Sequence, residues 1–229
     1  MCLGNLPLRL LVAFVVSFSW CVATNAGAPV VGGQPEDDSV SKETRAFIDR
    51  LDAKSGTARE ADLAGKGDVA ALAHLRSAAE DGDAESQYHL ALLYEDGKGV
   101  IRDDAQCALW IRKAADQDHQ GAQVRLIWLY EKGKCVPRDL ALAAGWARRV
   151  AENGESAGQA ALATDYYYGR GVQQDYVQAV KWYTVLKAGG HVSEGDTFLE
   201  RIKQNATALQ IAQGESLAHD WLQAHGPKK

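Results

Sequence analysis

The sequence predicts an all-α fold: an α/α solenoid of three full 36-residue helical-hairpin repeats, with a degenerate N-terminal unit and C-terminal capping helices. Two observations predict it. Shifting the chain by 36 residues aligns the same residue types in three successive segments, as with Tyr94, Tyr130 and Tyr166. Within each segment apolar residues recur every three or four positions, which is the spacing of one helix face. Such hairpins bury their apolar faces only by stacking on one another, so the repeat predicts a solenoid.

The first 26 residues have the pattern of a secretory signal peptide. Arg9 precedes an apolar run from Leu10 to Val22, which is shorter than the roughly 20 residues that a spanning helix needs. Small residues follow, so we expect cleavage after Ala26, with Ala23 as a second possible site; an uncleaved anchor is the alternative. The mature protein is expected to be secreted across the inner membrane into the periplasm, with no membrane span.

Two segments precede the full repeats. Residues 27–41, which include Gly32, Gly33 and Pro35, predict a flexible lead-in. Residues 42–81 predict a degenerate unit, with helices near 42–54, 57–65 and 68–80. The last of these aligns with the second helix of a full repeat, but His74 stands where each repeat has tryptophan.

The three repeats are predicted at 82–117, 118–153 and 154–190. In the first repeat, a helix near 84–95 should end at Gly97, because glycine adopts the left-handed cap conformation at little cost. Asp103 is the expected N-cap of the second helix. The apolar stripe of that second helix recurs at matching positions in the three repeats: Cys107, Trp110 and Ala114; Ala143, Trp146 and Val150; Ala179, Trp182 and Leu186.

Residues 191–225 predict capping helices. The 36-residue pattern stops after Gly190, and helices are expected at 194–203 and 207–224. In the longer one, Leu217 and Trp221 lie four residues apart, on one face of the helix.

The repeat resembles the Sel-one-like repeat (SLR) family, a relative of the tetratricopeptide repeat. The resemblance covers residues 68–190 and rests on Leu-Ala-Leu-Leu-Tyr-Glu-Asp-Gly-Lys-Gly-Val at 90–100 and its later copies. Two positions depart from the pattern: Cys135 replaces the second loop glycine, and Asp165 replaces an apolar residue. The resemblance implies adaptor or scaffold work in bacterial envelope complexes, regulation or secretion. Some exported, cysteine-rich members are described as penicillin-binding or β-lactamase-like.

Two cysteines remain if the signal peptide is removed, because Cys2 and Cys21 leave with it. In a stacked solenoid Cys107 and Cys135 lie at the same end of adjacent repeats, so a disulfide between them is expected in an exported protein. Two reduced thiols, or a reactive Cys107, are the alternatives.

Other chemistry finds little support in the sequence. The six histidines form no metal-binding pattern, and no cofactor or metal is expected. The Gly-x-Gly pairs follow helices and are turns, whereas phosphate-binding loops follow strands. No serine nucleophile motif occurs. A formal charge of −5 argues against nucleic-acid binding.

The surface left for binding is the side of each first helix that carries no repeat-defining residue. By analogy with tetratricopeptide grooves, it is expected to be the concave ligand surface. We call its candidate partner-binding residues the first-helix face: Tyr88, Leu92, Glu95, Trp128, Glu131, Thr164, Tyr167 and Tyr168.

These features predict an exported, non-enzymatic adaptor that binds a protein or peptide in its concave groove, as a monomer or weak oligomer. Aromatic side chains would supply most of the affinity, and the acidic rim would favour a basic partner. The alternatives are an envelope hydrolase acting on β-lactams or peptidoglycan, which rests on the resemblance alone, and a purely structural element.

Overall fold

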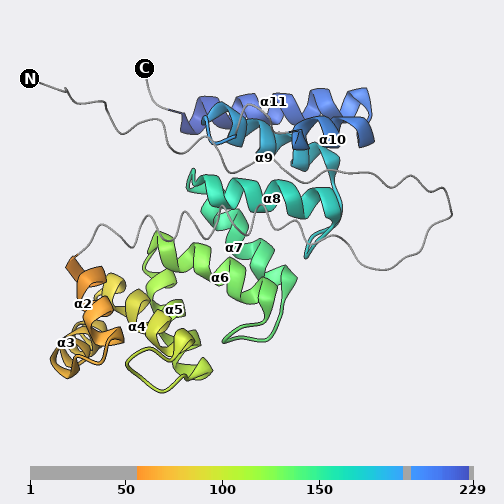
Figure 1. Cartoon of the computed structure of the whole chain (residues 1–229). Coiled ribbons are helices and arrows are strands. Elements are labelled where there is room, and N and C mark those ends of the chain that lie inside the picture. Colours follow the sequence, from red (N-terminus) through yellow and green to blue (C-terminus); the bar gives the residue numbers. More distant parts are fainter. Residues whose placement is uncertain (1–55, 193–196, 227–229) are drawn as a thin grey trace, which may run out of the picture. The chain divides into compact units, whose positions relative to one another are not determined.

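The computed structural model describes residues 56–192 and 197–226, where every regular element is an α-helix (Figure 1). The all-α prediction is confirmed. The predicted signal peptide, the lead-in and the predicted helix at 42–54 lie outside the described residues. None of the described helices is long and apolar enough to cross a membrane. The helices are α2 (Gly56–Gly65), α3 (Val69–Glu80), α4 (Ala84–Asp96), α5 (Asp104–Asp116), α6 (Gln120–Lys132), α7 (Leu140–Glu152), α8 (Ser156–Tyr168), α9 (Tyr176–Ala188), α10 (Phe198–Asn205) and α11 (Ala208–His225).

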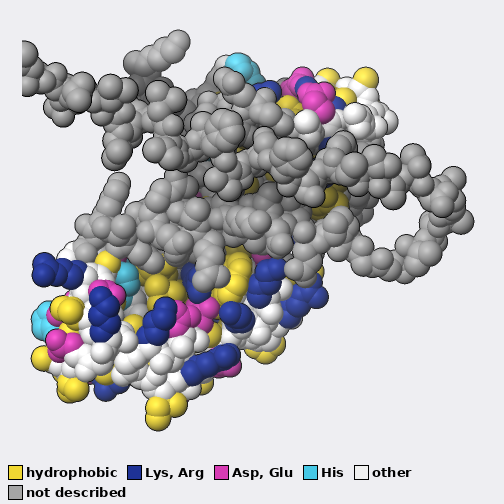
Figure 2. Space-filling view, viewed as in Figure 1, with side chains coloured by type: hydrophobic (Ala, Val, Ile, Leu, Met, Phe, Trp, Pro, Cys, Tyr) yellow, Lys and Arg dark blue, Asp and Glu magenta, His cyan; other side chains and the backbone are white. Residues whose placement is uncertain are grey.

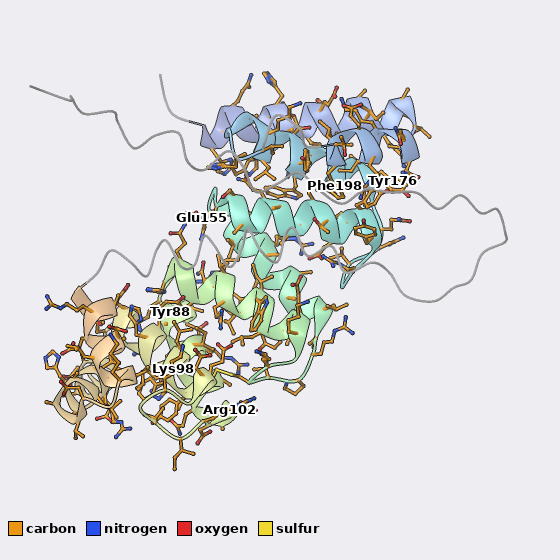
Figure 3. The ribbon with its side chains drawn as sticks, viewed as in Figure 1. Tyr88, Lys98, Arg102, Glu155, Tyr176 and Phe198 are labelled. Atoms are coloured by element: carbon orange, nitrogen blue, oxygen red, sulfur yellow. A yellow bond between two sulfur atoms is a disulfide. The ribbon has the colours of Figure 1, made fainter. Side chains whose placement is uncertain are left out.

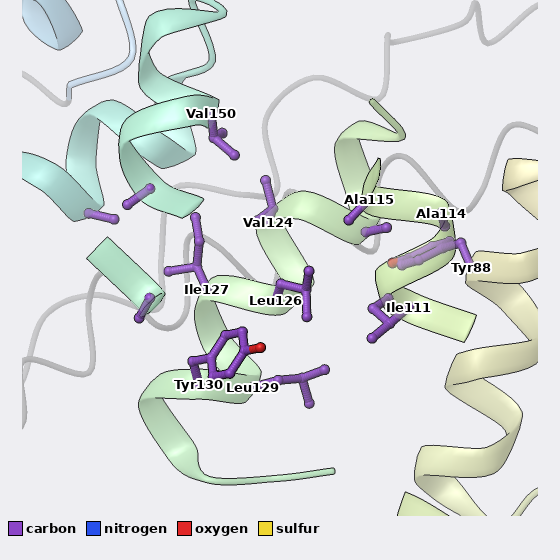
Figure 4. Close-up of a cluster of buried hydrophobic side chains, with 14 of the residues drawn as sticks. Tyr88, Ile111, Ala114, Ala115, Val124, Leu126, Ile127, Leu129, Tyr130 and Val150 are labelled. Atoms are coloured by element: carbon purple, nitrogen blue, oxygen red, sulfur yellow. The ribbon is translucent and has the colours of Figure 1, made fainter. Parts of the chain in front are cut away.

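The helices pack in chain order, and each hairpin stacks on the next. Contacts join α4 to α5, α5 to α6, α6 to α7, α7 to α8 and α8 to α9, which is the pattern of a solenoid. Figure 4 shows the buried cluster where α5 meets α6, with Ile111 and Ala115 beside Val124 and Leu126. All four side chains are buried, so one apolar core continues from hairpin to hairpin.

The helix ends form as the sequence predicts. Gly97 adopts a left-handed conformation after α4, with φ of 69°, and Gly133 and Gly169 do the same after α6 and α8. The side chain of Asp103 accepts hydrogen bonds from the backbone N–H groups of Ala105 and Gln106 at 2.9 and 3.0 Å. Aspartate caps of this kind also begin α7 and α9, so the loop geometry repeats with the sequence.

Polar residues that recur every 36 positions tie neighbouring helices together. Gln87 Nε2 donates to the backbone oxygen of Ala79 at 3.0 Å, and Gln123 Nε2 donates to that of Ala115 at 3.1 Å. A second series joins an arginine to the hydroxyl of a tyrosine 18 residues later, in the pairs Arg76–Tyr94, Arg112–Tyr130 and Arg148–Tyr166. The recurring glutamines and tyrosines are therefore structural.

The last helix packs through small residues. Gly214 and Ala218 are its buried positions, and a Cβ on Gly214 would lie 2.6 Å from the Cβ of Val180. Trp221 packs edge-to-face on Trp182 with ring centroids 5.8 Å apart, whereas Leu217 stays 39% exposed. The face that packs is therefore the small-residue face, because only small side chains let α11 approach α9 this closely.

Gly169 and Gly171 both have positive φ angles, of 70° and 67°. They differ in how close the neighbouring chain comes, because the backbone passes much nearer to Gly171. A Cβ on Gly171 would lie 2.0 Å from the backbone oxygen of Leu140, whereas one on Gly169 would find its nearest neighbour, the Cβ of Gln174, at 3.4 Å. We expect Gly169→Ala to cost about 1 kcal/mol, from backbone strain alone. Gly171→Ala should cost about 2–3 kcal/mol, because the loop must also move. Urea denaturation of the two variants checks this, and equal losses would contradict it.

Candidate functional site

The structure divides the first-helix face between buried and partly exposed side chains. Tyr88, Glu95 and Thr164 are buried, with 1%, 7% and 2% of their surface exposed. The half-buried members are Leu92, Trp128, Glu131, Tyr167 and Tyr168. The face is therefore not the continuous row of exposed aromatic and acidic side chains that the sequence predicted.

Tyr88 packs between two helices of adjacent repeats (Figure 3). Its ring centroid lies 4.8 Å from that of His119, and a Cβ on Gly121 would come 3.3 Å from Tyr88 Cζ. His119 caps α6, since its Nδ1 accepts a hydrogen bond from the N–H of Ala122 at 3.1 Å, while its Nε2 lies 2.9 Å from a carboxylate oxygen of Glu85. The prediction that Tyr88 is displayed for a partner is wrong, because this ring fills the space between α4 and α6.

Glu95 forms a buried ion pair with Arg125. The guanidinium donates two hydrogen bonds to the carboxylate, at 3.0 and 2.6 Å, and both side chains are less than a tenth exposed. Glu95 therefore belongs to the packing between α4 and α6 and is not an acidic rim residue.

Trp128 is half-buried in the second half of α6, and two basic side chains lie over its ring. The guanidinium carbon of Arg125 lies 4.6 Å from the centroid of its ring, and Lys134 Nζ lies 4.9 Å from it. Both distances are within the range of cation–π attraction. The sequence prediction missed these neighbours. Arg125 lies one helical turn before Trp128, so helical spacing could have indicated it, but Lys134 comes from the following loop.

Two carboxylates and one arginine meet between α6 and α8. Arg170 Nε donates to Asp165 at 3.2 Å, and another guanidinium nitrogen lies 4.0 Å from Glu131. Burial raises the pKa of Asp165 to about 7, although the arginine opposes this shift. Burial also raises the pKa of Glu131. The predicted rim acid Glu131 is thus partly compensated by a cation, and Asp165 replaces the buried leucine of the other repeats with a titratable group.

The tyrosines at the end of α8 pack within the fold. The ring of Tyr167 contacts those of Tyr168, Tyr176 and Phe198, with centroids 4.7, 5.9 and 5.3 Å away. Its hydroxyl accepts a hydrogen bond from Asn205 Nδ2 at 3.0 Å. Tyr167 therefore anchors α10, the first capping helix.

The remaining two α8 residues of the face differ from each other. The hydroxyl of Thr164 donates to the backbone oxygen of Ala160 at 2.9 Å and stays inside the fold. The half-buried ring of Tyr168 lies 5.9 Å from the guanidinium carbon of Arg170. Of the predicted aromatic row, Trp128 and Tyr168 are therefore the members that keep exposed surface and anchor no capping helix, and the ring of Trp128 also packs partly against the core.

Stability should depend on pH through Asp165. Because its pKa is raised from 3.8 to about 7, the folded state keeps a proton that the unfolded chain has released. We therefore expect stability to fall as pH rises through this window, with Glu131 contributing in the same direction. Asp165→Leu, which restores the leucine of positions 93 and 129, should remove most of the fall. Urea midpoints measured across the window check this.

A control of opposite sign is available at Asp118. Hydrogen bonding to Arg149 holds the pKa of this exposed carboxyl below its usual value, so its contribution is lost as pH falls. Asp118→Asn should therefore leave unchanged the fall in stability that Asp165 causes as pH rises. Parallel curves for wild type and Asp165→Leu would contradict the assignment to Asp165.

The disulfide joins Cys107 of α5 to Cys135 of the loop after α6, with Cα atoms 5.9 Å apart. The predicted pairing is therefore present. Cys135 has a φ angle of 56°, the left-handed conformation that glycine adopts at the matching positions 99 and 171. Among the described residues, one group of three potential metal ligands occurs, formed by the two sulfurs and Glu95. The disulfide and the Arg125 ion pair already engage these atoms.

Comparisons with known proteins agree with this architecture. The Sel1 repeat family model matches residues 66–83, 84–119, 121–155 and 156–191, which is more than half of the chain. The crystal structure of a Sel1 repeat protein from Oxalobacter formigenes is 32% identical, with 59% of this chain and 98% of that one covered and a TM-score of 0.49. No curated protein matches.

A second solved structure shares the fold. It is that of c5321, a protective antigen present in uropathogenic Escherichia coli strains that displays an SLR fold. It is 27% identical with a TM-score of 0.50, and the match covers 80% of this chain and 49% of that one, so this chain spans about half of its length. The match of the family model to four consecutive repeats, over more than half of the chain, shows that the chain belongs to the Sel1 repeat family.

Proposed function

We propose that this protein is an exported adaptor that binds a protein or peptide partner at the first-helix face, centred on Trp128. Sel1 repeat solenoids typically act as scaffolds for protein–protein interactions. The observation that carries the proposal is the partly exposed indole of Trp128 beside two basic groups. Tryptophan is enriched among the residues that dominate binding energy at protein interfaces.

Two features support a location in the bacterial envelope. Residues 1–26 have the charge, apolar run and small-residue exit of a signal peptide. The Cys107–Cys135 disulfide suits an oxidising compartment such as the periplasm. The mechanism is recognition: a partner would cover the exposed part of Trp128 and remove it from water, and no bond would be made or broken.

Crosslinking in cells tests this proposal. A photoreactive phenylalanine analogue is placed at position 128 and, as the matched control, at position 142, where Leu142 is 48% exposed on the second helix of the same repeat. We expect a discrete adduct at 128 and none at 142. Equal or absent labelling at both positions would contradict the adaptor function and favour a structural role.

A further inference from the structure

We propose that the partner is an acidic peptide segment, which docks on a basic patch that we call the Trp128 surface: Trp128, Lys134 and Arg138. This inference rests on the proposed function and names the chemistry of the partner. It reverses the expectation of a basic partner, which assumed that Glu95 and Glu131 form an acidic rim.

The acidic groups around Trp128 are already compensated. Glu95 is held in its buried ion pair by Arg125, and Arg170 lies between Glu131 and Asp165. Because the pKa of Asp165 is about 7, this carboxyl is partly protonated near neutral pH. Neither Glu95 nor Asp165 therefore presents a full negative charge to an incoming chain.

The basic groups are in excess at this place. Lys134 and Arg138 are exposed, and neither has a carboxylate within ion-pair distance among the described residues. Arg138 folds back on the end of α6, where its Nε donates to the backbone oxygen of Glu131 at 3.0 Å. Even with every carboxylate ionised, the basic groups outnumber the acidic ones in the set formed by Arg125, Lys134, Arg138, Arg170, Glu95, Glu131 and Asp165. The chain as a whole has a charge of −5, so this surface is a local exception.

Matching positions in the other repeats set Lys134 apart. Lys98 pairs with Asp96 at 2.7 Å, and Arg170 pairs with Asp165 at 3.2 Å. In the middle repeat, Lys134 instead lies over the ring of Trp128. The first repeat has Leu92 at the position that matches Trp128. The Lys134 ammonium can therefore pair with a carboxylate of a partner without breaking an ion pair. Lys98 and Arg170 would each have to give up an existing ion pair to do so.

The chemistry of recognition follows from these positions. A carboxylate of the partner would accept a hydrogen bond from the Lys134 ammonium, with Arg138 adding long-range attraction. An apolar side chain next to that carboxylate would cover the exposed part of Trp128. The required segment therefore combines Asp or Glu with an apolar residue, and its binding should weaken as salt screens the charges. Figure 2 shows several Lys and Arg side chains on the described part of the visible face.

Three labelled peptides test the inference by fluorescence anisotropy with the full chain. The probe alternates Leu and Glu, and the comparison peptides carry Gln or Lys in place of every Glu. We expect the Glu peptide to bind at least about tenfold more tightly than the Gln peptide, and more weakly with rising salt. Equal affinity of the Glu and Gln peptides would overturn the inference.

Matched charge reversals locate the effect. Lys134→Glu and Lys98→Glu change the net charge equally, at the same position of adjacent repeats. We expect Lys134→Glu to weaken binding of the Glu peptide about tenfold, and Lys98→Glu to change it less than about twofold. Equal effects would mean that attraction is not local to Trp128 and would overturn the inference. Tighter binding after neutralisation of Glu36, Asp37 and Asp38 would also overturn it, because the chain's own acidic residues would then be the occupant.

The crosslinking experiment separates this inference from the proposed function. If position 128 gives a discrete adduct, mass spectrometry identifies the partner segment. A segment with Asp or Glu beside apolar residues supports the inference, whereas a neutral or basic segment overturns it and leaves the adaptor function standing. No adduct at 128, together with no binding of any peptide, would overturn both.

Discussion

Replacing Arg125 with Met is expected to lower the free energy of unfolding by about 3–5 kcal/mol, because the change leaves the Glu95 carboxylate buried without its partner. Both side chains are less than a tenth exposed, and two hydrogen bonds of 3.0 and 2.6 Å join them. Methionine keeps the unbranched stem of the side chain but lacks the guanidinium, so the loss combines the unpaired Glu95 carboxylate with the space that the guanidinium leaves. Urea denaturation at neutral pH measures it.

Two variants make this prediction specific. The double variant Glu95→Met/Arg125→Met should recover most of the lost stability, because a buried ion pair is often no more stabilising than an apolar pair of similar volume. Arg148→Met is the matched control. It removes an exposed arginine that donates to the hydroxyl of Tyr166 at 2.8 Å, so it should cost less than about 1 kcal/mol. A loss for Arg125→Met no larger than for Arg148→Met would show that the buried pair is not specifically required.

The hairpins could be predicted from the sequence because their determinants recur in register. Gly97 ends α4 and Asp103 begins α5, and the same residue types stand at matching positions of the next two repeats. Helix caps and apolar helix faces are determined within one hairpin, where spacings of three and four residues decide which side chains meet.

The first-helix face could not be predicted in the same way, because contacts between repeats follow other separations. Glu95 and Arg125 are 30 residues apart, and Glu85 and His119 are 34 apart. Such pairs fall in different columns of the 36-residue alignment, so comparing columns does not reveal them. Removing the repeat-defining residues therefore left a mixture of half-buried side chains, such as Trp128, and side chains that fill the space between neighbouring first helices, such as Tyr88.

The two departures from the repeat pattern carry structural information. Asp165 stands where Leu93 and Leu129 fill the core of earlier repeats, and it brings a titratable group into a buried position. Cys135 stands where the other loops have glycine and keeps the backbone conformation of glycine. The sequence identified both positions as unusual and predicted the disulfide of Cys135, but the raised pKa of Asp165 depends on side chains that only the structure places around it.

Removing the disulfide should cost about as much stability as breaking the buried ion pair. The bond closes a loop with a sequence separation of 28 residues. The chain-entropy model gives about 3–4 kcal/mol for a loop of this length, because the cross-link restricts the unfolded chain. We therefore expect Cys107→Ala/Cys135→Ala to lower the free energy of unfolding by about that amount, measured by urea denaturation under oxidising conditions. Treating wild type with a thiol reductant should produce a similar loss.

The backbone at position 135 provides an internal check on that result. Glycine adopts a φ angle of 56° without strain, whereas alanine there costs about 1 kcal/mol. Cys107→Ala/Cys135→Gly should therefore be about 1 kcal/mol more stable than Cys107→Ala/Cys135→Ala, although both lack the bond and both stay well below wild type. Equal stability of the two double variants would mean that the loop relaxes once the bond is gone. A Gly variant as stable as wild type would mean that the disulfide only offsets the strain of placing a non-glycine residue in this loop.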